Sequence, residues 1–139
     1  MVNSVTELLN LAYPTQRGIR NKIIEDIIDR IKNNNVNLGL TRDELYLVID
    51  EAITNAMEHG NNWDSNKKVK VKVNRNERYV EVLIEDEGMG FNSDREGKSI
   101  SAIKNLKPRG RGIYIIKQFC EPFWNDKGNM IGLRFPIPG

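Results

Sequence analysis

Residues 51–60 read EAITNAMEHG, a stretch with two distinct sides when it is projected as a helix. Ala52 and Ile53 belong to an apolar side that repeats about every 3.6 residues, whereas Glu51 and Asn55 lie one helical turn apart. The carboxylate and the amide therefore point the same way from adjacent turns. A solvated helix face and a ligand site both explain this pair, because Glu-x-x-x-Asn alone is a weak motif.

The helix that contains this stretch has a recognisable start and end. Thr41 is followed three residues later by Glu44, the pattern of a capping box, which stabilises a helix start by about 1 kcal/mol. Gly60 and the two asparagines after it are typical of a helix end. We therefore predict a helix from Arg42 to about Glu58.

The remaining segments predict two more helices and two pairs of strands. The isoleucines of residues 16–32 recur at helical spacing, and RGRGIYIIKQFC at 109–120 predicts a helix that begins at its glycines. Residues 68–85 hold two runs in which valine or isoleucine alternates with other residues, which predicts an antiparallel hairpin. Two short strands are expected in 122–137, the polar stretch 92–108 predicts a mobile loop, and the N-terminus has a weak edge-strand pattern.

Helices grouped between paired strands predict an α+β fold, specifically a two-layer sandwich. The length of 139 residues fits a single domain over residues 1–139. The single cysteine, Cys120, excludes an internal disulfide framework, and one cysteine with one histidine cannot close a zinc shell. The net charge of +2 does not indicate a nucleic acid or membrane partner, and no leader or spanning segment is recognisable, so a cytoplasmic protein is expected.

Two glycine-containing segments add candidate ligand contacts. In EDEGMGF at 85–91, Asp86 ends a predicted strand and Gly88 and Gly90 follow, so a carboxylate and a closely approachable backbone lie together. Such an aspartate can accept a hydrogen bond from an exocyclic amino group such as that of adenine. A plain strand-ending turn remains the alternative for this segment.

The second segment, PRGRGIYII at 108–116, places two glycines and two arginines at the predicted start of a helix. Free N–H groups at a helix start bind anions, and the arginines add positive charge there. A glycine-rich helix cap with solvated arginines is the alternative. The segment matches neither the phosphate-binding loop G-x-x-x-x-G-K-[ST] nor the dinucleotide fingerprint G-x-G-x-x-G after a first strand.

The order of these motifs carries more information than any one of them. E-x-x-x-N-A on a helix, D-x-G-x-G after a hairpin, and G-x-G opening a later helix resemble the GHKL ATPase superfamily. Its members share the Bergerat nucleotide-binding fold, the histidine-kinase-like ATPase domain. The GRGIYIIKQF version of the last motif is similar to the anti-sigma-factor serine/threonine kinases of bacteria. The resemblance covers about residues 15–137.

The resemblance implies a site for ATP or ADP with Mg²⁺. Asn55 is expected to coordinate the metal, Glu51 to act as general base towards a serine hydroxyl or water, and Asp86 to accept the adenine amino group. The family often has Gly-Thr before its last strand, whereas this chain has Gly128-Asn129, so Asn129 is expected to supply the hydrogen-bonding group. Further contacts are expected to the base or the phosphates from His59, Gly88, Met89, Gly90, Arg109, Gly110, Arg111, Gly112 and Ile113.

The resemblance also implies a function and partners. It predicts a kinase that sequesters a sigma factor, phosphorylates an anti-sigma antagonist protein, forms a homodimer and regulates transcription. A nucleotide-gated binding module without phosphoryl transfer and a small ATPase remain alternatives. A sensor histidine kinase is disfavoured because the one histidine, His59, lies inside the nucleotide motif.

Overall fold

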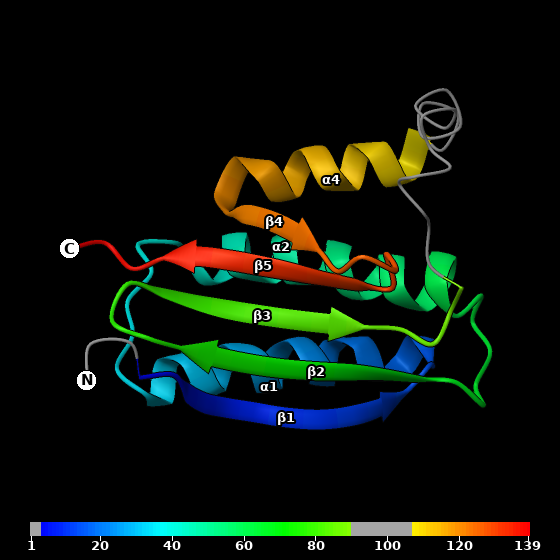
Figure 1. Cartoon of the computed structure of the whole chain (residues 1–139), viewed down its shortest axis with the longest axis horizontal. Helices are drawn as coiled ribbons and strands as arrows, with labels where there is room; N and C mark the ends of the chain where they lie inside the picture. The colour runs from blue at the N-terminus through cyan, green and yellow to red at the C-terminus, as the bar shows by residue number, and fades with distance from the viewer. Residues whose placement is uncertain (1–3, 90–106) are drawn as a thin grey trace.

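The computed structural model describes the backbone of residues 4–89 and 107–139, and the side chains of 4–89 and 112–139. Its strands form one antiparallel five-stranded sheet in the order β1-β2-β3-β5-β4 (Figure 1). Their bounds are β1 Thr6–Pro14, β2 Lys68–Arg75, β3 Tyr79–Glu85, β4 Glu121–Trp124 and β5 Met130–Pro136. The weakly patterned N-terminal segment is thus a full edge strand, paired with β2.

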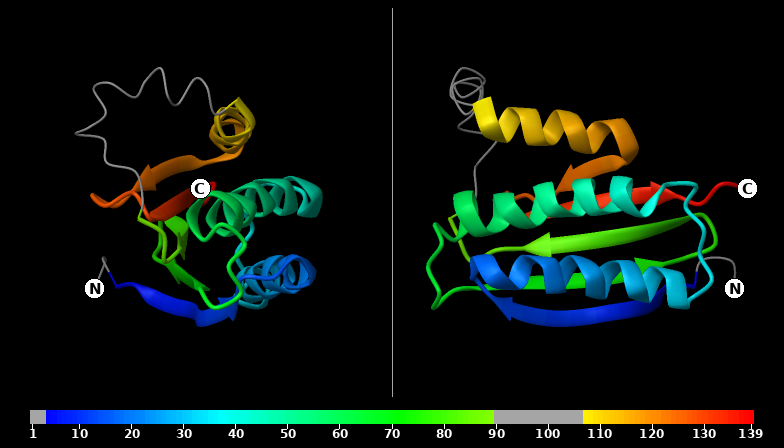
Figure 2. Two further views of the ribbon diagram at one scale, coloured as in Figure 1. Left: turned by 90° about the vertical axis from the view of Figure 1, so that its right-hand side faces the viewer. Right: turned by 180° about the vertical axis from the view of Figure 1, so that it is seen from behind.

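Three α-helices of the described chain lie on one side of the sheet (Figure 2). A 3₁₀ turn at Arg17–Ile19 leads into α1, and the helices are α1 Arg20–Asn33, α2 Arg42–Asn55 and α4 Lys107–Phe119. The α1 and α2 helices cover the sheet, and α4 packs beside α2 and β4. This arrangement confirms the predicted two-layer α+β fold. In the described residues, no helix combines the length and hydropathy needed to cross a bilayer.

The core lies between the helices and the sheet, where the alternating strand residues meet the apolar helix faces. On α2, Ile49 and Ile53 are fully buried, as the projection of the sequence predicts. The alternating valines and isoleucines of β2 and β3 are likewise buried. The predicted capping box is present, because the Glu44 N–H donates to Thr41 Oγ1 at 3.1 Å and the Thr41 N–H donates to Glu44 Oε1 at 2.8 Å.

The helical segment of α2 stops at Gly60 and Asn61 as predicted but changes type before its end, and the predicted start of α4 is wrong. The α-helical ladder of α2 ends at Asn55 and continues as a π-helical turn over Ala56–Gly60, so regular α-helix does not reach Glu58. The α4 helix begins at Lys107, three residues before Gly110, so the glycines lie inside its first two turns. The first four N–H groups of a helix are the free ones, and Gly112 is beyond them. Most of the predicted 92–108 loop lies outside the described residues.

Candidate functional site

Three strand ends meet beside α2 at one end of the sheet. The β3 strand ends opposite the start of β5, and β4 ends one residue further along β5. The backbone N–H of Asp86, which follows β3, donates a 2.8 Å hydrogen bond to the carbonyl of Asn129, which precedes β5. A cavity of about 20 Å³ lies here, lined by Ala52, Asn55, Ala56, Ile84, Asp86, Ile113, Trp124, Gly128, Asn129, Met130 and Ile131.

The polar rim of this cavity is held by its own hydrogen bonds. Asn129 Nδ2 donates to the Asp86 carbonyl at 3.1 Å, and Asn125 Nδ2 donates to Asn129 Oδ1 at 2.7 Å. The Asp86 carboxylate accepts from the Gly88 N–H at 2.8 Å. Asp86 and Asn129 are therefore held side by side in the wall of the cavity, which Asn55 also lines.

A second part of the site lies where α2 faces α4. A methyl group built on Gly112 would come within 2.6 Å of Glu51 Oε2 and 3.5 Å of Asn55 Nδ2. The absent side chain of Gly112 thus leaves the space into which both polar side chains project. This arrangement favours a ligand site over a merely solvated helix face, because a carboxylate and an amide share one recess with the backbone of a second helix.

Burial raises the pKa of the Glu51 carboxyl above its ordinary value, and the neighbouring negative charge of Asp50 raises it further. A carboxylate with a raised pKa is a better proton acceptor once it is ionised. Glu51 therefore has the electrostatic character of a general base, whereas Asp50 has a different set of partners.

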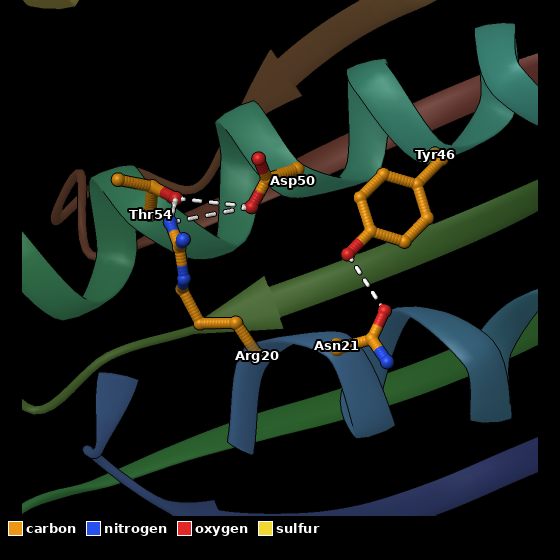
Figure 3. A network of polar contacts seen from close by, with 5 residues as sticks. All are labelled: Arg20, Asn21, Tyr46, Asp50 and Thr54. Atoms are coloured by element: carbon orange, nitrogen blue, oxygen red, sulfur yellow. Dashed lines mark hydrogen bonds and ion pairs between the residues drawn. The ribbon is translucent and has the colours of Figure 1, made fainter. Parts of the chain in front are cut away.

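The partners of Asp50 belong to a network of polar contacts between α1 and α2 (Figure 3). Arg20 Nη1 donates to Thr54 Oγ1 at 2.7 Å and lies 3.4 Å from Asp50 Oδ1, while Thr54 Oγ1 donates to the same oxygen at 3.3 Å. One turn earlier on α2, the Tyr46 hydroxyl donates to Asn21 Oδ1 at 2.8 Å. This polar network fixes the rotation of α2 about its axis, and the side of α2 that carries Glu51 therefore faces α4.

The turn after α2 is fastened to the sheet by one buried amide. Asn61 Nδ2 donates to Thr15 Oγ1 at 2.9 Å and to the Lys68 carbonyl at 3.1 Å, and its Oδ1 accepts from the Glu87 N–H at 2.8 Å. Next to it, a methyl group on Gly60 would collide with the Asp86 carboxylate. The π-helical turn and the Asp86 loop are thus in direct contact.

Comparison with known proteins identifies this arrangement. The family described as "Histidine kinase-like ATPase domain" matches residues 23–135. The chain belongs to this family. The superfamily and fold expected from the sequence are therefore confirmed, and membership of this ATPase family implies binding of ATP or ADP.

The curated relatives of this histidine kinase-like ATPase domain have two kinds of name. An anti-sigma F factor from Shouchella clausii (strain KSM-K16) is 31% identical over 91 residues, 64% of this chain and 62% of that protein. The sensor protein VraS of Staphylococcus haemolyticus (strain JCSC1435) is 30% identical over 128 residues, 92% of this chain and 34% of that protein. The chain thus spans less than two thirds of the first relative and about a third of the second.

The structure brings several predicted site residues of the ATPase domain together. Asn55, Asp86, Ile113 and Asn129 line the cavity, and Glu51 lies with Gly112 beside it. Gly88 touches the backbone of Gly60, so its lack of a side chain serves the contact between the two loops.

Other predicted residues lie elsewhere. Met89 is 89% exposed and is not part of the cavity wall. His59 lies in the π-helical turn with its Nε2 3.2 Å from Glu58 Oε2. Gly90 lies outside the described residues. Arg109, Gly110 and Arg111 belong to the first turns of α4, where the side chains are not described.

Sequence reasoning missed three residues that shape the site. Trp124 lines the cavity, Asn125 holds Asn129, and Asn61 joins the loops. Asn125 stands four residues before Asn129 in a predicted turn, a usual place for a side chain that bonds nearby backbone. No local pattern marks Trp124, because its position depends on the pairing of β4 with β5.

The donor chemistry of the site fits a magnesium nucleotide. Asn55 and Glu51 offer oxygen atoms, which Mg²⁺ prefers, while the described residues contain no cluster of three or more His, Cys, Asp or Glu able to hold a metal. A metal there would take most of its other ligands from phosphate and water. The cavity is smaller than the roughly 300–1,000 Å³ of typical ligand pockets, and an adjoining hollow of about 290 Å³ shares Asp86 and Asn129 with it.

Two larger hollows, of about 330 and 290 Å³, lie over the open face of the sheet. Both are surface depressions whose walls include Lys70 and Glu85, and the smaller of the two is also lined by Asp86 and Asn129, so it adjoins the cavity at the strand ends. The cavity at the strand ends, together with the hollow that shares Asp86 and Asn129 with it, is the better candidate, because apolar side chains and convergent polar groups meet there.

Proposed function

We propose that the protein is an anti-sigma-factor kinase that binds ATP with Mg²⁺ and transfers the γ-phosphoryl group to a serine hydroxyl of an antagonist protein. The observation that carries this proposal is the recess shared by Glu51, Asn55 and Gly112 beside the cavity with Asp86. The similarity to an anti-sigma F factor supports the choice of substrate class. Sequestration of a sigma factor and action as a cytoplasmic homodimer belong to the same proposal.

Each residue has a defined task in this proposal. The Asp86 carboxylate accepts a hydrogen bond from the amino group of adenine, and Asn129 keeps the carbonyl of Asp86 oriented beside it. Asn55 offers its amide oxygen to the metal, which would supply positive charge to neutralise the phosphates. Glu51 accepts the proton from the attacking hydroxyl, a step that contributes about 10²–10⁴-fold to the rate.

The position of Glu51 suits that task. Its neighbour Asn55 is one turn further along α2, so the base and the metal-side residue can reach the same phosphoryl group from one helix. The Gly112 backbone packs close to the carboxylate, because the missing side chain at this position lets Glu51 Oε2 approach it. Partial burial also reduces competition from water at the transferred proton.

A second candidate function is supported by the similarity to VraS over 92% of the chain. In this alternative the domain delivers phosphate to a histidine rather than to a serine. The two candidates differ in the product, since phosphoserine survives acid and phosphohistidine does not.

The experiment incubates the purified protein with γ-labelled ATP, Mg²⁺ and an extract of the native cell. We expect an acid-stable label on a small protein, no label with Glu51→Gln, and unchanged ADP uptake by that variant in calorimetry. An acid-labile label would support the second candidate. If the wild-type protein takes up no ADP at millimolar concentration, both candidate functions are overturned. If it takes up ADP but no partner protein becomes labelled, a binding module is favoured.

A further inference from the structure

Among the described residues that line the cavity, Trp124 is the aromatic one. Trp124 is the last residue of β4, at the sheet edge that α4 covers. It is 37% exposed while it also lines the cavity with Ile113 and Asn129. A tryptophan in this position presents part of its ring to the cavity and part to solvent, an arrangement that suits an aromatic side chain with one apolar and one wet side.

We propose that Trp124 forms the aromatic wall against which the purine base stacks, an inference that rests on the proposed nucleotide function. The cavity is also lined by the small side chains Ala52 and Ala56 of α2. A flat base between small methyl groups and a large ring has apolar contact on both faces. The polar edge of the base then faces Asp86 and Asn129, whose positions are fixed by hydrogen bonds.

The size of the cavity gives Trp124 a second property. The cavity of about 20 Å³ is too small for a whole base, so binding has to involve the rim and the adjoining hollow that shares Asp86 and Asn129. The buried residues Ala52, Ala56 and Ile84 are held within the core. Trp124 is the most exposed of the large apolar residues that line the cavity, so its ring can adjust with less disturbance of the core than Ile113 or Met130.

Tryptophan fluorescence emission reports directly on contact between Trp124 and a bound base, and the second tryptophan of the chain provides a matched control. Trp63 lies after the π-helical turn with Arg17 stacked 3.9 Å over its ring, and it does not line the cavity. In Trp63→Phe the emission comes from Trp124 alone, and in Trp124→Phe it comes from Trp63 alone. We expect ADP with Mg²⁺ to change the emission of Trp63→Phe and to leave that of Trp124→Phe unchanged.

Affinity provides the second measurement. In calorimetry, Trp124→Leu should bind ADP about tenfold more weakly than wild type, as expected for loss of one base–aromatic stack. Trp124→Phe, which keeps an aromatic plane, should recover most of that affinity, and Trp63→Phe should equal wild type. Unfolding curves of each variant show whether the fold is kept.

The outcomes separate this inference from the proposed function. If wild type binds ADP but Trp124 emission does not respond and Trp124→Leu binds equally well, the stacking wall is refuted while nucleotide binding stands. If Trp124→Leu binds ADP more weakly and Trp124→Phe binds it no better than Trp124→Leu, stacking is refuted and Trp124 has a general packing role instead. If wild type takes up no ADP, the proposed function fails and this inference falls with it.

Discussion

Replacing Gly112 by alanine should separate the packing of α4 from the chemistry of Glu51. The new methyl group would lie 2.6 Å from Glu51 Oε2, whereas ordinary van der Waals contact begins at 3.4 Å, so the carboxylate must retreat by about 0.8 Å. The oxygen is the far end of a flexible side chain, so this retreat costs little stability. Alanine inside a helix gains about 0.5–1 kcal/mol over glycine. We therefore expect Gly112→Ala to unfold at the same or a slightly higher temperature.

The rate of phosphoryl transfer should respond differently. A misplacement on the order of 1 Å at a reacting group lowers a rate about 100-fold, so labelling of the partner should fall by that factor while ADP uptake persists. Gly132→Ala is the matched control: its methyl group would collide with the Phe123 ring on the far face of the sheet, costing about 1–3 kcal/mol without touching Glu51. Wild-type labelling by a folded Gly112→Ala protein would refute the assignment of Glu51 as the base.

Three further predictions concern stability and reactivity. Folding raises the pKa of Glu51, so the folded state loses stability as pH rises from the unfolded to the folded pKa of this carboxyl. Glu51→Gln should therefore be more stable than wild type at neutral pH. In urea titrations this difference in the free energy of unfolding should vanish below about pH 4. Thr41→Ala loses the capping box and should cost about 1 kcal/mol, lowering the melting temperature by roughly 4 °C in calorimetric scans. Cys120 is 8% exposed, and burial raises the pKa of its thiol to about 12, so a chromogenic thiol reagent at pH 8 should react only after unfolding in guanidinium; rapid native labelling would contradict this.

The features that sequence reasoning captured are governed by local periodicity. The apolar side of α2 and the alternation in β2 and β3 each follow from a repeat of a few residues, so Ile53 and Val71 could be assigned to the core without knowing the fold. Thr41 could be assigned to a helix start for the same reason. Asp86 and Asn55 were found through the spacing of motifs, which fixes the order of the elements but not their contacts.

The features that escaped depend on contacts between distant segments. The π-helical turn after Asn55 has no signature in AMEHG, and it is accompanied by buried Asn61, which ties Thr15 to the Glu87 backbone. The place of Trp124 follows from the register of β4 on β5. In each case the decisive partner lies more than six residues away in the chain, beyond the reach of periodicity or capping rules.

The location of the candidate site follows from how α2 is held. One side of this helix is fixed by burial of Ile49 and Ile53 against the sheet, and a second by the contacts of Asp50 and Thr54 with Arg20 of α1. A helix presents side chains in all directions around its axis, so the side that carries Glu51 is left to face α4. The side chain of Glu51, the proposed base, is thereby oriented by interactions that do not involve it. Loss of Arg20 would accordingly act on the site by releasing the rotation of α2, although every residue that contacts the ligand remained in place.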